Sequence, residues 1–121
     1  MPRYIDIGAN LTDTMFRGVY REKAKHEDDF DAVLQRGWDA GLDKVMVTAG
    51  CLKDIEEAKA LCEQDDRLYT TVGVHPTRCG EFEADGGDPA AYLAQLEAHL
   101  GEAHIGSGGS KIVAIGECGL E

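Results

Sequence analysis

Polar residues with metal-binding or acid–base chemistry stand at the ends of four apolar runs in this chain. The first run contains Asp6 and is followed by Asn10, the second reaches Thr48, the third is followed by His75 and the fourth by Glu117. In parallel α/β folds the ligand site forms where the carboxyl ends of the strands meet. We therefore expect these side chains on one rim. Their carboxylate, amide and imidazole groups suit a divalent metal, with Mg²⁺ favoured and Mn²⁺ or Zn²⁺ as alternatives.

Each candidate also has an ordinary structural role that must be weighed against function. Asp6 could hydrogen-bond neighbouring backbone amides, and Asn10 could shape the turn that follows the first strand. His75 could be a satisfied loop histidine, and Arg78 could bind a substrate phosphate or simply be an exposed arginine. Glu117 is the strongest candidate, because an ionised carboxylate at the mouth of a buried strand needs a cationic partner.

The apolar runs alternate with helical patterns along the chain. The runs span residues 4–8, 44–49, 68–74 and 111–116, and helical stripes cover 30–41, 54–62 and 88–100. Asp28 is expected just before the first helix and Asp54 as the cap of the second, and Asp88 with Pro89 combines a preferred cap with proline at the first helical position. Near-continuous apolar strands alternating with helices indicate a parallel sheet with right-handed crossovers.

The order βαβαβαβ favours one half of a barrel. A closed (β/α)₈ barrel takes about 250 residues, and an open doubly wound sheet normally carries a glycine-rich phosphate turn after its first strand, which this sequence lacks. The sequence also stops five residues after the fourth apolar run. We therefore predict a TIM-barrel-type half-barrel over residues 1–121, the amino-terminal half of a (β/α)₈ metal-dependent hydrolase, with no second domain. A complete small α/β sheet is the alternative.

The composition limits the partners of the chain. Its 23 Asp and Glu against 12 Lys and Arg give a net charge of −11, which disfavours unaided binding to nucleic acid. Bound metal ions would supply local positive charge for a phosphate. The four cysteines are widely separated, which favours free thiols and an intracellular place, cytoplasmic or nuclear. No apolar run approaches the roughly 20 residues that span a bilayer, so no membrane partner is expected.

Three other patterns fail to match a functional motif. The segment from Gly106 to Lys111 resembles a phosphate loop in composition, but it enters a strand and is expected to be a flexible loop. His26 begins a zincin-like helix pattern in which Phe30 stands where the second histidine is required. Cys51 and Cys79 lie near strand ends, where a small core or loop residue is favoured over a reactive thiol.

Three segments together resemble the TatD family of metal-dependent deoxyribonucleases. They are IDIGANLTD at residues 5–13, GVHPTRCGEF at 73–82 and AIGECGL at 114–120, and the second is similar to the eukaryotic TatD-domain branch. The resemblance implies a (β/α)₈ barrel that hydrolyses phosphodiester bonds of DNA, from a strand end, with one or two divalent metals. It also implies that Glu117 bridges the metals and that His75 lies beside the scissile phosphate. Many relatives place His-x-His where this chain has Gly8-Ala9-Asn10.

Three functions compete on these observations. The first is a TatD-like nuclease, or its amino-terminal portion, whose activity belongs to the complete barrel. The second is an amidohydrolase of small molecules, which Gly8 and Asn10 count against. The third is a non-catalytic truncated product that pairs with another chain, including a second copy of itself, through its open sheet edge. The family motif continues Gly-Leu-Asp where this chain reads Gly119-Leu120-Glu121. Three readings of this difference are open: a natural variation, the end of an alternative product or a vector-derived scar.

Overall fold

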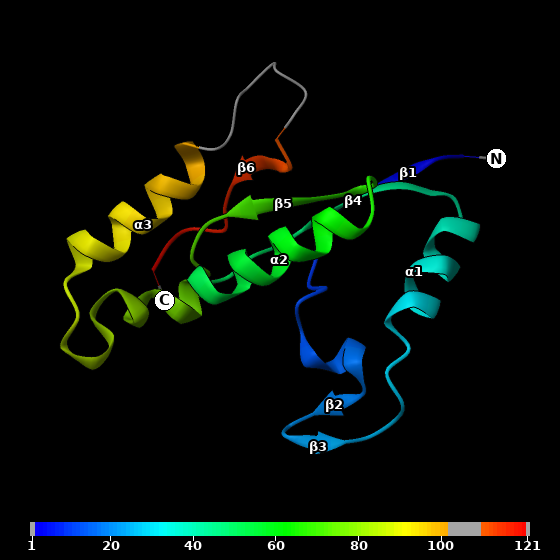
Figure 1. Cartoon of the computed structure of the whole chain (residues 1–121), viewed down its shortest axis with the longest axis horizontal. Coiled ribbons are helices and arrows are strands. Elements are labelled where there is room, and N and C mark those ends of the chain that lie inside the picture. The colour runs from blue at the N-terminus through cyan, green and yellow to red at the C-terminus, as the bar shows by residue number, and fades with distance from the viewer. Residues whose placement is uncertain (1, 102–109, 121) are drawn as a thin grey trace.

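The computed structural model of the protein describes residues 2–101 and 110–120. Most of the expected loop at Gly106 to Ser110, and the terminal Glu121, lie outside the described residues. The described chain builds one sheet of four parallel strands with three α-helices between them (Figure 1). None of the helices in the described part of the chain has the length and hydropathy of a membrane span.

The main sheet contains four strands in the order in which they follow one another along the chain. They are β1 (Tyr4–Ala9), β4 (Leu42–Val47), β5 (Leu68–Val72) and β6 (Ile112–Ile115), and all three neighbouring pairs are parallel. A doubly wound sheet would reverse its strand order at a switch point, whereas a barrel adds each strand beside the last. The observed order is therefore that of a barrel segment.

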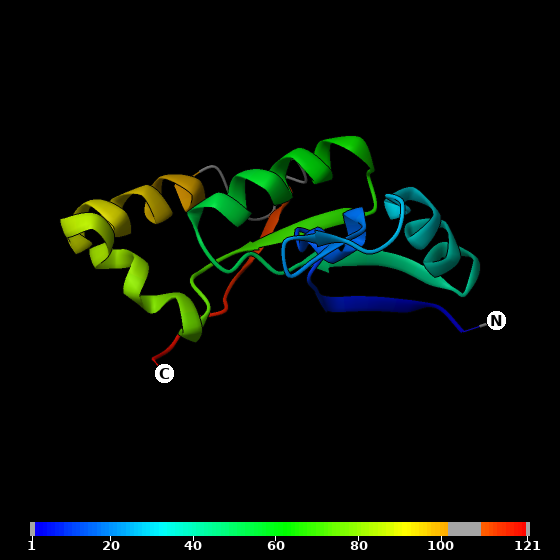
Figure 2. The same ribbon diagram turned by 90° about the horizontal axis from the view of Figure 1, so that it is seen from below.

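The three α-helices cover one face of this sheet (Figure 2). They are α1 (Phe30–Asp39), α2 (Leu52–Gln64) and α3 (Pro89–Gly101). The Asp28 carboxylate accepts the Phe30 N–H and the Asp88 carboxylate accepts the Ala90 N–H, so both expected start signals are confirmed. Helices on one face alone are what a barrel wall requires, because its other face is turned inward.

The start of α2 differs from the sequence expectation. Cys51 occupies the N-cap position, two residues after buried Ala49, and Asp54 lies inside the first turn. The Asp54 carboxylate instead reaches back and accepts the Gly50 N–H at 3.1 Å. The prediction of Asp54 as the cap was wrong because a carboxylate at the third helical position can satisfy a backbone donor that precedes the helix.

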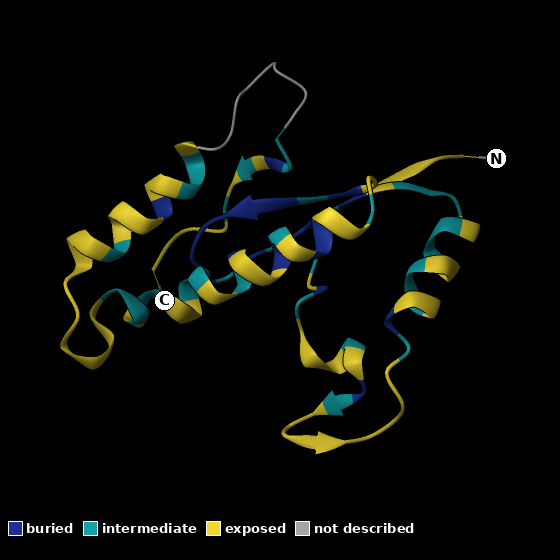
Figure 3. Ribbon diagram, in the orientation of Figure 1, coloured by how far each residue is buried: buried dark blue, intermediate teal, exposed yellow. Residues whose placement is uncertain are grey.

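Apolar side chains of the sheet and helices form two core clusters. One centres on Phe30, Val47 and Leu61 beneath α1 and α2, and the other on Ile55 and Leu96 beneath α2 and α3. Figure 3 shows the burial concentrated on β5 and on the sheet-facing side of α2. Helical and strand periodicity thus direct one face of each element into the same layer.

The opposite face of the sheet carries apolar side chains that none of the helices formed by residues 2–101 and 110–120 covers. Met46 alternates with buried Val45 and Val47 and therefore turns to this second face, which we call the inner face. Ile5, Met46, Tyr69 and Val113 line a hollow of about 190 Å³ there. Lys44 and Lys111 approach the Tyr69 ring at 5.6 and 4.4 Å, in cation–π geometry.

Smaller elements fill the connections. The long loop after β1 contains a short 3₁₀-helix η1 (Thr14–Arg17) and the hairpin β2 (Val19–Tyr20) with β3 (Lys23–Ala24), which lie below the main sheet in Figure 1. A longer kinked 3₁₀ segment, η2 (Pro76–Gly86), joins β5 to α3.

A cation–π contact lies at the end of the sheet where β5 begins. There Arg67 stacks over Trp38 at 4.0 Å, and its side chain donates two hydrogen bonds to the Asp65 carboxylate.

Candidate functional site

A polar pocket opens at the carboxyl ends of the four main strands. It has a volume of about 350 Å³ and is lined by Asn10, Thr12, Asp13, Thr48, Gly50, Asp54, His75, Thr77, Arg78 and Glu117. Four of the five residues that the sequence predicted as site residues, Asn10, His75, Arg78 and Glu117, therefore share one pocket. Thr48, expected on the same rim, lines it as well.

His75 and Glu117 face one another across this pocket. The Nε2 atom of His75 lies 3.4 Å from the Oε2 atom of Glu117. The other ring nitrogen, Nδ1, accepts the Thr77 N–H at 3.1 Å and contacts the Thr77 hydroxyl at 2.7 Å. Because Nδ1 is an acceptor, the neutral ring carries its proton on Nε2. His75 thus presents a ring donor toward Glu117 and the pocket, and its backbone N–H donates to the Gly50 carbonyl at 2.9 Å.

The position of Glu117 depends on a close approach of two backbones. Gly73, which follows β5, lies against the Gly116–Glu117 peptide so tightly that a Cβ atom there would overlap the Gly116 carbonyl and the Glu117 carbonyl oxygen. The Gly116 N–H donates to the Val72 carbonyl and extends the β5–β6 pairing by one residue. A residue without a side chain at position 73 therefore lets Glu117 leave the sheet directly at the pocket.

Asp6 lies outside the pocket lining. Its Oδ1 atom accepts the Gly8 N–H at 2.9 Å, within its own strand. The β1–β4 register is irregular over the same residues, since Asp6 pairs with Val45 while Ala9 pairs with Val47. In that step two residues of β1, Ile7 and Gly8, lie against the single β4 residue Met46, which is the geometry of a bulge. The described contact thus gives Asp6 a backbone role within β1.

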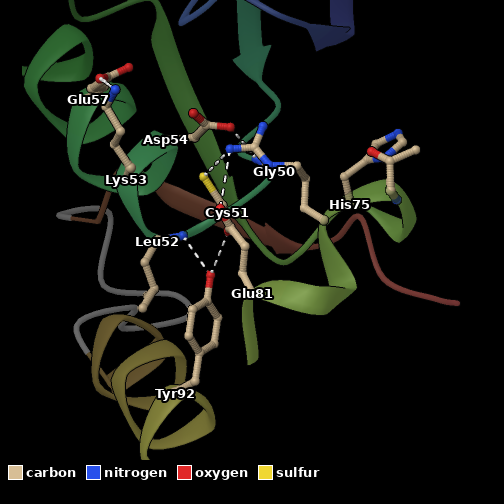
Figure 4. Close-up of polar contacts among 11 residues, drawn as sticks. Gly50, Cys51, Leu52, Lys53, Asp54, Glu57, His75, Glu81 and Tyr92 are labelled. Carbon is tan, nitrogen blue, oxygen red and sulfur yellow. Dashed lines mark hydrogen bonds and ion pairs between the residues drawn. The ribbon is translucent and has the colours of Figure 1, made fainter. Parts of the chain in front are cut away.

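Arg78 reaches the pocket from η2 and is held by two partners. Its Nη2 atom lies 3.3 Å from the Cys51 sulfur and 3.5 Å from Glu81 Oε1. Figure 4 shows how Glu81 is connected further, to Tyr92 of α3. The Tyr92 hydroxyl donates to Glu81 Oε2 at 3.2 Å and accepts the Leu52 N–H at 3.2 Å. Sequence reasoning missed this arrangement because it joins three elements that are distant along the chain.

The buried thiols are unsuited to nucleophilic chemistry. Burial raises the pKa of the Cys51 thiol above its ordinary value, an effect that nearby Arg78 opposes only weakly. Burial likewise raises the pKa of Cys62 to about 11. Both side chains are protonated at neutral pH, and only the thiolate is a strong nucleophile. Cys51 is therefore a packed helix-start residue, as the sequence favoured, while Cys79 is half-buried and Cys118 exposed.

Two pocket carboxylates escaped the sequence prediction as site residues. Asp13 caps η1 by accepting the Met15 N–H at 2.8 Å, and Asp54 binds Gly50, yet both also line the pocket. A usable signal for Asp13 was its place soon after the first strand end. Asp54 gave none, since its short-range capping pattern is common at helix starts.

The residues present fit one side of a divalent-metal site. Within residues 2–101 and 110–120, no three His, Cys, Asp or Glu side chains gather closely enough to hold a metal ion. Glu117 and Asn10 nevertheless bring a carboxylate and an amide oxygen to the same pocket, and oxygen ligands are those that Mg²⁺ prefers. The pocket therefore offers part of a coordination shell, with His75 beside it as a hydrogen-bond donor.

Known proteins resemble the chain over nearly all of its length. It is 42% identical over 119 residues to "Deoxyribonuclease Tat-D" of Schizosaccharomyces pombe, covering 98% of this chain and 37% of that protein. It is 32% identical to "3'-5' ssDNA/RNA exonuclease TatD" of Citrobacter rodentium, covering 96% of this chain and 35% of that one. The chain thus spans little more than a third of the length of these relatives.

Two solved structures match the fold of the chain. A hydrolase TatD family protein from Entamoeba histolytica matches with a TM-score of 0.75 at 40% identity, over 98% of this chain and 38% of that one. An uncharacterized amidohydrolase from Saccharomyces cerevisiae matches with a TM-score of 0.81 at 27% identity, over 98% of this chain and 37% of that one. The family described as TatD related DNase matches residues 5–121. The chain belongs to the TatD related DNase family and has part of its TIM-barrel, amidohydrolase-type fold.

Proposed function

We propose that this chain forms one side of the active site of a divalent-metal-dependent deoxyribonuclease that hydrolyses phosphodiester bonds of DNA, with Mg²⁺ as the favoured ion and Mn²⁺ or Zn²⁺ as alternatives. The observation that carries the proposal is the His75 and Glu117 pair, 3.4 Å apart in a pocket that also holds Asn10 and Arg78. The names of the relatives, a deoxyribonuclease and an ssDNA/RNA exonuclease, support DNA as the substrate.

Four of the pocket residues have separate parts in this reaction. Glu117 and Asn10 would supply oxygen ligands to the metal, and Arg78 would contact a phosphate oxygen of DNA. A bound divalent ion would lower the pKa of water and neutralise charge on the phosphate. His75, with its proton on Nε2, donates a hydrogen bond or a proton to an oxygen of the scissile group. The Thr77 contacts at Nδ1 keep the ring in this tautomer.

The proposal assigns the complete activity to a closed barrel, which has more strands than the four described in the main sheet. The strands that would close the barrel come from further chain, as in the relatives of about 2.7 times this length, or from an associated copy. The widely separated cysteines support an intracellular location, in the cytoplasm or nucleus.

A chimera provides the direct test. Residues 2–120 of this chain would replace the matching third of the Schizosaccharomyces pombe relative, and the product would be assayed on single-stranded DNA with Mg²⁺. We expect metal-dependent cleavage that Glu117→Ala abolishes together with divalent-ion binding measured by calorimetry. The matched control is Glu83→Ala, which removes a carboxylate outside the pocket. Wild-type metal affinity and turnover in Glu117→Ala would refute the assignment of Glu117.

A further inference from the structure

The guanidinium of Arg78 is held in place through residues that lie outside the pocket. Arg78 is the one lysine or arginine among the residues that line it. Glu81 binds the guanidinium through Oε1 and the Tyr92 hydroxyl through Oε2. The same hydroxyl accepts the first backbone N–H of α2, from Leu52. Two side chains, Glu81 and Tyr92, therefore link Arg78 to the backbone of α2. Figure 4 shows the part of this link that runs from Glu81 through Tyr92 to Leu52.

The anchor of this chain is well fixed. The Tyr92 ring is half-buried and packs against Phe82, with ring centroids 4.6 Å apart. Its hydroxyl uses one acceptor and one donor position, so the direction of its proton toward Glu81 is determined. Burial raises the pKa of Tyr92, so the hydroxyl stays protonated at neutral pH. An arginine held in this way loses less side-chain entropy when it binds a ligand.

The contacts of Arg78 leave part of its donor set available. Among the described residues, both hydrogen bonds of the guanidinium involve Nη2, and none involves Nη1 or Nε. Cys51 is a neutral thiol, so the carboxylates of Glu81 and Asp54 are the nearby charges that offset Arg78, and Glu81 contacts the guanidinium at 3.5 Å. The Nη1 and Nε groups can therefore donate to a phosphate, because guanidinium groups bind phosphate through paired, charge-assisted hydrogen bonds.

We propose that Glu81 and Tyr92 are positioning residues that hold Arg78 as the contact for a non-bridging phosphate oxygen of DNA. The proposal rests on the proposed nuclease function and adds to it the means by which the phosphate is oriented beside Glu117. It assigns a binding role, so the two residues act on the affinity for phosphate and not on the chemical step.

The first experiment needs no catalysis. The ¹⁵N-labelled chain would be titrated, with Mg²⁺ present, with inorganic phosphate and then with a short single-stranded oligonucleotide, while the Arg78 Nε–H resonance is followed by NMR. Tyr92→Phe removes only the hydroxyl, and Glu81→Asp keeps the charge but shortens its reach. We expect each variant to shift the Arg78 resonance before any ligand is added. Each should also weaken phosphate binding roughly 3- to 10-fold, the scale of one hydrogen bond.

Matched controls separate positioning from general damage. Tyr20→Phe and Glu83→Asp make the same chemical changes away from the polar pocket, and they should stay within about twofold of the wild-type affinity. Circular dichroism and melting would show that each variant is folded. If both test variants behave like their controls, or if the Arg78 resonance of the wild-type chain responds to neither ligand, the proposal is overturned.

The second experiment uses the chimera with the Schizosaccharomyces pombe relative. Tyr92→Phe and Glu81→Asp should raise KM for DNA several-fold and leave kcat within about twofold. DNA cleavage with an unchanged KM in both variants would overturn the positioning role and leave the nuclease function standing. An Arg78 resonance that responds as expected, in a chimera that cuts no DNA, would refute the nuclease function and leave the phosphate contact standing.

Discussion

His75 has its two ring nitrogens committed to different tasks. Thr77 occupies Nδ1 with its N–H and hydroxyl, while Nε2 faces Glu117. A histidine that binds a metal through Nε2 normally donates its Nδ1 proton to a second partner. Here Nδ1 is an acceptor, so the described geometry suits a hydrogen-bond or proton donor better than a metal ligand. From the sequence, the resemblance to the TatD family implied that His75 lies beside the scissile phosphate.

Replacement of His75 tests this role. In the chimera, His75→Ala should slow DNA cleavage by roughly 10²-fold or more, the scale for loss of a general acid or base, while divalent-ion affinity is largely kept. His26→Ala is the control, because His26 is exposed and lies outside the polar pocket. Unchanged turnover at saturating Mg²⁺ would contradict the role of His75.

At the residue scale, sequence reasoning succeeded where a side chain follows a strand directly. His75 and Glu117 were placed at one rim because parallel strands end at the same edge, and the pocket contains both. Asp6 was grouped with them by the same argument. Its carboxylate instead binds the Gly8 N–H, because Asp6 lies inside β1 and not at its carboxyl end.

A pair of substitutions distinguishes the two roles of Asp6. Asp6→Ala should lower the urea midpoint of unfolding by removing the acceptor for Gly8, and Asp6→Asn, which keeps an acceptor oxygen, should restore most of it. If Asp6 acts only through the backbone, divalent-ion affinity in Asp6→Asn equals that of the wild type. A large loss of metal affinity in Asp6→Asn would instead support the ligand role predicted from the sequence.

At the scale of elements, one glycine lets β5 and the end of β6 come together. Gly73→Ala should reduce the free energy of unfolding by about 1–3 kcal/mol, because the new methyl group overlaps backbone that cannot rotate away. It should also displace Glu117 and weaken divalent-ion binding. Gly80→Ala is a close control, since a Cβ atom there meets nothing within 4 Å. Equal urea denaturation curves for the two variants would contradict this explanation.

The regular elements were predictable, and their connections were not. Strand and helix positions agreed to within a few residues because apolar periodicity is a local signal. The β2–β3 hairpin, the 3₁₀ segment η2 and the Cys51 start of α2 were not predicted. The Gly18 carbonyl beside the hairpin accepts the N–H groups of Lys25 and His26, and the Tyr92 hydroxyl, 40 residues away along the chain, accepts the Leu52 N–H at the start of α2. Apolar periodicity carries no sign of either contact.

At the scale of the whole molecule, the inner face and the two sheet edges lack covering layers in the described part of the chain. Ile5 and Val113 are about half exposed on that face, and β1 and β6 end the sheet. Unpaired strand edges and uncovered apolar surface favour association. The barrel order of the strands also means that two copies could share one interior, as two half-barrels.

The isolated 121-residue chain should therefore self-associate into soluble oligomers and be inactive as a nuclease. Its net charge of −11 opposes precipitation. Light scattering combined with a Mg²⁺-dependent DNA cleavage assay provides the measurement. A stable monomer that cuts DNA would show that four strands suffice for activity, and that no further strands are needed to complete the nuclease.

The stacking of Arg67 on Trp38 gives the molecule an optical reporter. Trp38 is the single tryptophan of the chain, and it lies on α1 beneath a guanidinium that Asp65 holds by two hydrogen bonds. A cation over an indole ring alters its fluorescence, so the emission reports whether α1 is docked against the residues that lead into β5. The fluorescence of Trp38 can therefore report, without any added label, how the sheet forms at the end opposite the polar pocket.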